Sequence, residues 1–397
     1  MGDRLADLRT RRGLTQERLA ERAGLSVDVV RKLEQGRRST ARLSSINAMA
    51  QALDTEPSYL VGQPTTFQGL ADGGSDLPSI LALRQAVSPV SDLLGGDVDP
   101  EDPPSVEDLQ AALRSTETIR REGRMGEIGA LLPQLIHDAR LATHAYTGPD
   151  AAAAFSVLAV AYQVAATTLA ALGKEDAAFT AMERSLAAIR QGDDPKLETL
   201  AASTLAWVLT KQGRLSDAER VALTRADQIE PGFRSAPEDL ALWGILLLRA
   251  ATATVRQRRH DDVTQLLALA RGAAQTMGRD LSVYATPFGP TNAGVAHVNF
   301  LVEMGRSAEA IRDSRAIPGL VHLPPTWRAR FHVDRALAYH DLGKDAAATR
   351  SLLQAEQDAP EWMRYHSTSR RLVADLRGRA RRGAPVLGLA DRLGLLR

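Results

Sequence analysis

Residues 14–37 read LTQERLAERAGLSVDVVRKLEQGR, and this stretch decides how the first part of the chain is organised. Thr15 and Ser26 each precede a run of apolar residues at helical spacing, where hydroxyl side chains cap helices. Gly24 lies between the two runs and permits a tight turn. The stretch therefore predicts two short helices joined by a turn, the second of them closing at Gly36.

Apolar spacing on either side of this stretch predicts three more short helices. The first is spaced by Leu5 and Leu8, the fourth is spaced by apolar residues over 43–53, and Pro57 opens a fifth. We therefore expect a five-helix domain over residues 1–62. Residues 63–104 are rich in glycine, proline, serine and aspartate and indicate a linker, in which a helix within 77–94 is expected to dock onto one of the domains.

From residue 105 to residue 397, a glycine followed by a basic residue recurs, and an alanine-rich helix follows it. The steps are Gly123-Arg124, Gly173-Lys174, Gly213-Arg214, Gly305-Arg306 and Gly343-Lys344, with Arg259-His260 in the same place of a repeat that lacks the glycine. The spacing of roughly 38 to 50 residues is longer than that of tetratricopeptide repeats, but the pattern resembles them. We expect an α-solenoid of tetratricopeptide-like helix pairs, closed by a C-terminal capping helix in the basic tail.

Composition supports an all-α protein and narrows its setting. Alanine, leucine and arginine are abundant, aromatic residues make up only 4%, and cysteine is absent, which excludes disulfides and thiolate chemistry. The charged start of the chain argues against a secretory signal, and we find no apolar run long enough for a membrane helix. A cytoplasmic protein is expected. The net charge is +1, but by segment it is about +3 over residues 1–62, about −7 over 63–122 and about +7 over 364–397.

Residues 14–26 and 33–37 resemble the phage-repressor-like helix-turn-helix family, also called the xenobiotic-response-element family. The whole chain is also similar to actinobacterial regulators that join this domain to tetratricopeptide repeats, through Trp207 and the blocks at 288–292 and 364–366. The first resemblance implies that Ser26–Gln35 is a recognition helix in the DNA major groove. It further implies that Arg9 and Glu34 form an internal ion pair.

Eight residues follow from this resemblance as DNA contacts: Gln16, Val27, Asp28, Arg31, Lys32, Arg37, Arg38 and Arg42. Lysine donates to guanine, aspartate accepts from cytosine N4 and valine contacts the thymine methyl group, so three of them suit base readout. Arg31 suits a base or a phosphate, and Asp28 equally suits a purely capping role at the helix start. Gln16 and the three later arginines suit phosphates.

Ligand candidates in the repeat domain are polar or aromatic residues on the first helix of each pair: Tyr162, Gln163, Thr204, Trp243, Arg249, Asn292, Asn299, Arg328, His332 and Arg335. Asn292 and Asn299 are seven residues apart and share a helical face, and the arginines suit a carboxylate. For each residue, core packing or hydrogen bonding between repeats is an equal alternative. Trp207 favours the core, and 288–292 fits either a ligand contact or a proline-started helix.

No catalytic constellation, cofactor motif or metal-ligand spacing is recognisable, so we expect no enzyme. The acidic run over 97–102 lacks the pattern of a calcium loop. The sequence predicts a homodimeric transcriptional regulator that binds double-stranded DNA and couples a peptide, small-molecule or protein signal in the repeat groove to operator affinity. The alternative is a scaffold or adaptor protein with weak or tethering DNA binding, and neither reading involves a membrane.

Overall fold

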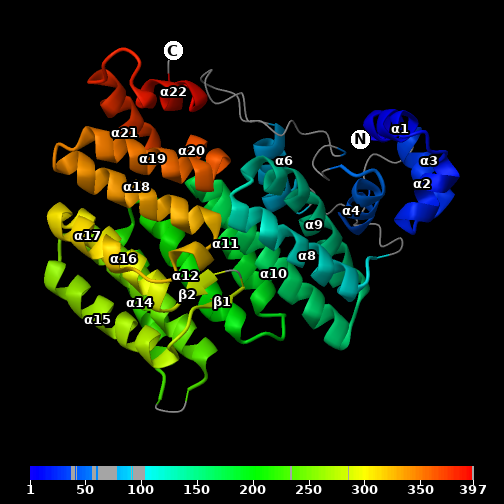
Figure 1. The fold of residues 1–397 in the computed structure, drawn as a ribbon. Helices are drawn as coiled ribbons and strands as arrows, with labels where there is room; N and C mark the ends of the chain where they lie inside the picture. Colours follow the sequence, from blue (N-terminus) through cyan, green and yellow to red (C-terminus); the bar gives the residue numbers. More distant parts are fainter. Residues whose placement is uncertain are drawn as a thin grey trace. The chain divides into compact units, whose positions relative to one another are not determined.

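The computed structural model describes residues 1–36, 41, 43–55, 60, 78–90, 92, 103–232, 235–284 and 286–395 (Figure 1). Within them the chain forms 20 α-helices and one two-stranded sheet, which confirms the all-helical prediction. The chain divides into two compact units. Unit 1 comprises residues 1–120, 124–169 and 180–197, and unit 2 comprises 121–123, 170–179 and 198–397.

The first helices form where their caps predict them. They are α1 (Gly2–Arg11), α2 (Gln16–Ala23), α3 (Val27–Glu34) and α4 (Leu43–Ala52). The Thr15 hydroxyl accepts a hydrogen bond from the Arg18 amide at 3.2 Å, and the Ser26 hydroxyl accepts one from the Val29 amide at 3.4 Å. Gly24 adopts φ 63°, as the turn requires. The expected fifth helix around Pro57 falls mostly outside the described residues.

One apolar core holds these four helices together. Leu5, Leu19, Leu33 and Met49 are all 0% exposed and belong to a single buried cluster. Because each helix contributes to this cluster, the helices gain their stability from packing against one another rather than from their short length.

The helix expected within the linker is α6 (Pro78–Val87), and it packs against α9 (Met125–Ala145) inside unit 1. Ile80, Leu83 and Val87 are buried. Leu81 remains 48% exposed, since it lies on the opposite face of this helix.

Helix pairs make up the chain beyond residue 105, as predicted. Besides α8 (Val106–Glu122) with α9, the pairs are α10 (Gly148–Ala171) with α11 (Glu175–Ile189), α12 (Lys196–Lys211) with α13 (Leu215–Gln228), α14 (Pro237–Arg256) with α15 (His260–Met277), α16 (Pro290–Glu303) with α17 (Ser307–Asp313), and α18 (Pro325–Asp341) with α19 (Asp345–Asp358). Three further helices, α20 (Pro360–Tyr365), α21 (Ser367–Gly378) and α22 (Pro385–Arg392), pack against α19, and α21 contains most of the basic tail.

The glycine-basic steps between paired helices share one backbone geometry. The five step glycines have φ between 67° and 76°, a left-handed conformation. In four of them the next residue donates its amide to the carbonyl five residues earlier, as Arg214 does to Leu209 at 2.9 Å. This hydrogen bond satisfies an otherwise unpaired carbonyl at the end of the first helix.

The step in the fourth pair requires a correction. We expected Arg259-His260 to replace the glycine-basic pair, but Arg258 is the residue with positive φ, 62°, and the Arg259 amide donates to the Thr254 carbonyl at 3.3 Å. Arg258 therefore stands at the glycine position and Arg259 at the basic position. The sequence pattern shifted by one residue because arginines occupy both places.

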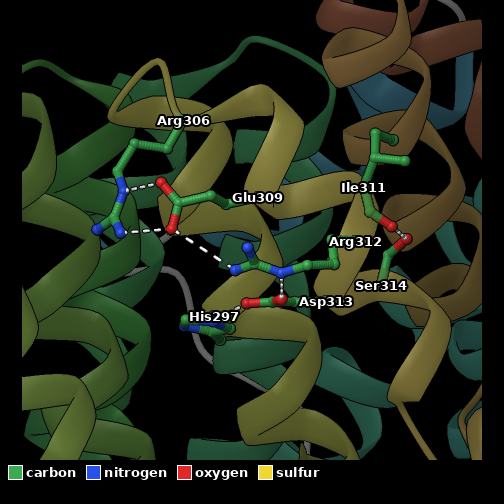
Figure 2. A network of polar contacts seen from close by, with 7 residues as sticks. All are labelled: His297, Arg306, Glu309, Ile311, Arg312, Asp313 and Ser314. Carbon is green, nitrogen blue, oxygen red and sulfur yellow. Dashed lines mark hydrogen bonds and ion pairs between the residues drawn. The ribbon is translucent and has the colours of Figure 1, made fainter.

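Most of these basic residues also pair with a carboxylate three residues later. Arg306 and Glu309 approach to 2.6 Å (Figure 2), and Arg214 with Asp217 and Arg259 with Asp262 repeat the arrangement. The acidic side chain lies in the first turn of the second helix, where the helix dipole favours negative charge.

A short hairpin between α15 and α16 is the one element of the described chain that is not helical. Its strands β1 (Leu281–Val283) and β2 (Thr286–Phe288) are antiparallel and only three residues long. Phe288 is completely buried against Gly244 of α14, where an added Cβ would lie 2.0 Å from the ring. Helix α16 begins at Pro290, as the proline-started alternative predicted.

Helix α10 is more apolar than the sequence analysis expected of any segment. Among the described helices, α10 is long and apolar enough by composition to cross a membrane, with a mean hydropathy of 1.6 in its most apolar window. However, 67% of that window is buried inside the structure, which is typical of a core helix.

Candidate nucleic-acid interface and ligand site

The solvent face of α3 carries the charged candidates for base readout. Asp28, Arg31 and Lys32 are exposed, whereas Val27 and Val29 are partly buried and pack against the core of the first four helices. Of the residues predicted on this helix, the charged ones are therefore the most accessible to a partner.

Asp28 and Lys32 form an ion pair across one turn of α3. Their charged atoms are 2.8 Å apart, and the two side chains are 59% and 53% exposed, respectively. The hydrogen bond from Lys32 holds the pKa of Asp28 below its usual value. The Lys32 ammonium keeps further N–H donors beyond this contact, so the ion pair leaves it able to donate to a base edge.

Glu34 has a buried carboxylate that accepts hydrogen bonds from two other helices of the domain. Its carboxylate accepts two hydrogen bonds from Arg9, at 2.6 and 2.9 Å, and one from the Gln16 amide at 2.6 Å. The glutamate side chain is only 5% exposed, and the pairing raises the pKa of Arg9. The internal ion pair is confirmed, and Gln16, expected to contact a phosphate, donates to Glu34 in this structure.

The three predicted phosphate-binding arginines, Arg37, Arg38 and Arg42, lie outside the described residues. They remain predictions from the sequence.

In unit 1, the predicted ligand residues Tyr162 and Gln163 lie inside the fold, 3% and 8% exposed. Tyr162 interacts with Arg140, which together with Arg184 holds the Asp92 carboxylate. These two guanidinium groups, Arg140 foremost, lower the pKa of Asp92 to about 2. Tyr162 thus supports a cluster that fastens the end of the linker to α9 and α11.

Three predicted ligand residues on α18 already have partners within unit 2. Arg328 donates to Asp358 at 2.8 Å and also to the carbonyls of Val321 and Leu323. His332 lies 3.5 Å from Asp358, and burial lowers its pKa. Arg335 stacks its guanidinium over the rings of Phe331 and Tyr339, at 5.6 and 5.9 Å from the centroids. The contacts of all three favour a structural role.

The other candidates are divided between core and surface. Asn292 is 2% exposed, whereas Thr204, Trp207, Trp243 and Asn299 are partly buried. The two asparagines therefore differ in access although they are on one helix. The ammonium of Lys211 lies 5.6 Å from the centre of the Trp207 ring.

Arg249 is the candidate with the weakest compensation of its charge. Its Nε donates to the Ser203 hydroxyl at 3.2 Å, and burial, together with the charge of Arg330, lowers its pKa to about 10. Arg330 of unit 2 is the charged neighbour that acts on Arg249, and Arg330 together with Arg256 acts on Lys211. The sequence did not point to these three other cations. Arg256 could have been found, because it follows Arg249 by seven residues on the same helical face.

Comparisons with known proteins identify the first part of the chain. Residues 1–59 match the family model of a helix-turn-helix domain. No curated protein matches the chain.

Two solved structures are similar at low identity. The Bacillus thuringiensis PlcR in complex with the peptide PapR7 and DNA shares 12% identity, with a TM-score of 0.37 over 88% of this chain and 98% of that one. The tetratricopeptide repeat (TPR) domain of P58(IPK) shares 13% identity, with a TM-score of 0.25 over 91% of this chain and 98% of that one. By the family match, residues 1–59 are a helix-turn-helix domain, and the described chain beyond residue 105 is almost entirely helical.

Proposed function

We propose that the protein is a transcriptional regulator that reads its operator with α3 and senses a signal with its repeat region. The match of residues 1–59 to a helix-turn-helix domain is the observation that carries this proposal. The exposed charged face of α3 supports it, because the second helix of such a motif enters the major groove.

The contacts divide into base readers and phosphate contacts. Lys32 donates to guanine and Asp28 accepts from cytosine N4, and both side chains are exposed on α3. Val27 adds an apolar contact to a thymine methyl group, while Arg31, the downstream arginines and Gln16 bind phosphates.

A homodimer fits this mode of reading. One helix-turn-helix per subunit requires two half-sites about 34 Å apart, so the operator is a palindrome. The protein acts in the cytoplasm, as an actinobacterial regulator of the phage-repressor-like type. Its repeat region favours one DNA-binding arrangement when the signal binds, since only unequal affinity shifts an equilibrium.

Selection of genomic DNA fragments by the full-length protein across a salt series tests this proposal. A specific regulator enriches a two-fold symmetric motif that persists as salt rises, whereas non-specific binding falls steeply with salt. Enrichment of no motif, with or without cell extract as a source of signal, contradicts operator reading.

Two substitutions then separate readers from phosphate contacts. Lys32→Ala is expected to weaken binding by about 1–3 kcal/mol and to relax one operator position, while Arg38→Ala weakens all DNA alike and lowers the salt slope by about one. Arg220→Ala, at an exposed arginine of α13, is the matched control and leaves anisotropy titrations unchanged. Identical effects of the first two changes contradict the division.

A further inference from the structure

A row of polar side chains joins four consecutive first helices of the repeats in unit 2. Arg249 of α14 reaches Ser203 of α12 at 3.2 Å. Arg256 of α14 lies 3.9 Å from Glu303 of α16. Asn299 of α16 interacts with Asp334 of α18, which pairs with Arg330 at 3.1 Å. We call these residues, with Lys211, the polar row.

Cations in the polar row exceed the carboxylates that face them closely. Arg330 has Asp334 at 3.1 Å, and Arg256 has only the 3.9 Å approach of Glu303. For Arg249 and Lys211, no carboxylate of the described residues comes within 4.0 Å. The nearest hydrogen-bond partner of Arg249 is a neutral hydroxyl.

These cations act on one another. Burial and the charges of Arg330 and Arg256 lower the pKa of Lys211, and Glu175 offsets this only partly. The pKa of His366, at the start of α21, falls well below its usual value through burial and the charges of Arg330 and Lys211. The charge of Arg330 on α18 therefore disfavours the charged forms of Lys211 on α12 and Arg249 on α14. Asp334 and Glu303 keep the pKa of Arg330 itself raised.

The row also remains open to solvent. The side chains of Arg256 and Arg330 are 33% and 37% exposed, and Lys211 and Arg249 are partly buried. A cluster of partly dehydrated, accessible cations binds an anion strongly, because water competes weakly there and guanidinium groups bind oxygen atoms in pairs.

We propose that the polar row binds a multiply charged oxyanion, a phosphate or polycarboxylate group of the signal molecule, through Arg249, Lys211 and Arg330. This inference rests on the proposed function, for which it supplies the chemical class of the signal. Repulsion between these cations costs stability, as sites kept for a ligand commonly do.

Titration of the full-length protein with pyrophosphate and with citrate, at constant ionic strength, tests this inference. We expect saturable binding by calorimetry and a rise in Tm for at least one of the two anions, and none with sodium chloride. The anion that saturates assigns the group as phosphate or carboxylate.

Arg249→Gln retains a donor for Ser203 but removes the charge. It is expected to weaken binding about tenfold or more and to raise the Tm of the free protein, since it relieves repulsion. Lys211→Gln should act in the same direction, and Arg220→Gln on α13 is the control that changes neither value. A structural arginine would instead lower the Tm when substituted.

Absence of saturable binding to both anions overturns the inference, and so does unchanged binding by Arg249→Gln and Lys211→Gln. Because the titration contains no DNA, its failure leaves operator selection unaffected. Conversely, failure of operator selection leaves the titration valid as evidence for an anion site.

Discussion

Arginines in two positions of the helix pairs in unit 2 have different surroundings. At the steps that start the second helices, Arg214, Arg259 and Arg306 each approach a carboxylate three residues later to 2.8 Å or less. On the first helices, Arg249 has no such partner among the described residues, and burial and the charge of Arg330 disfavour its charged form.

The difference teaches that the presence of a carboxylate partner, rather than the arginine itself, decides what an arginine does. A step arginine is paired by its own local sequence and stays close to solvent, so it contributes little beyond shaping the turn. First-helix arginines differ among themselves, because Arg328 and Arg330 pair with carboxylates whereas Arg249 has only the Ser203 hydroxyl. The lack of a carboxylate partner singles out Arg249 as a candidate for ligand binding.

The largest loss of stability is expected where an arginine–carboxylate ion pair is buried. Arg9→Ala leaves Glu34 without its bidentate partner in a 5% exposed position, and should reduce the free energy of unfolding by about 2–4 kcal/mol. Urea denaturation of the full-length protein, followed by far-UV circular dichroism, measures this. Arg11→Ala, whose pair with Asp7 is exposed, is the control; equal losses from both would break the comparison.

A smaller loss is expected from Asp92→Asn, which removes the carboxylate shared by Arg140 and Arg184. We expect about 1–2 kcal/mol at neutral pH. The folded pKa, about 2, lies below the ordinary 3.8, so the carboxylate stabilises the fold above pH 4 and this contribution is lost as pH falls towards 2. Wild type and variant should therefore converge in acid-denaturation curves, and a constant gap down to pH 2 contradicts the pairing.

Arg258→Gly tests the backbone conformation of a step without changing the ion pair at that step. Arg258 adopts φ 62°, which costs a non-glycine residue about 1 kcal/mol, and the Arg259–Asp262 pair stays intact. The variant should gain up to about 1 kcal/mol, seen as a higher Tm by calorimetry. A lower Tm would show that the arginine side chain itself matters at this step.

The smallest effect is expected from Arg306→Gln. Its pair with Glu309 is 50% and 36% exposed, so the loss of stability should be barely measurable and shrink with added salt. A clear drop in Tm in thermal melts would show that the network in Figure 2, which continues through Arg312 to Asp313, is coupled.

Local chemistry was enough to predict much of this molecule. Hydroxyl caps at Thr15 and Ser26, the turn at Gly24 and the step glycines lie where the sequence predicts them, because each depends on a few neighbouring residues. The Arg9–Glu34 pair was predicted from a family resemblance and is confirmed.

Only the tertiary structure decided what residues far apart in the sequence do together. The three-residue strands and the burial of Phe288 against Gly244 depend on α14, which no local pattern connects to the hairpin. Arg328 and His332, candidates either for a ligand or for contacts within the repeats, face Asp358 of α19. The sequence by itself determined the helices and their ends, since capping and periodicity act within a few residues. Helix packing decided which charges meet, because electrostatic balance depends on distances across the fold rather than along the chain.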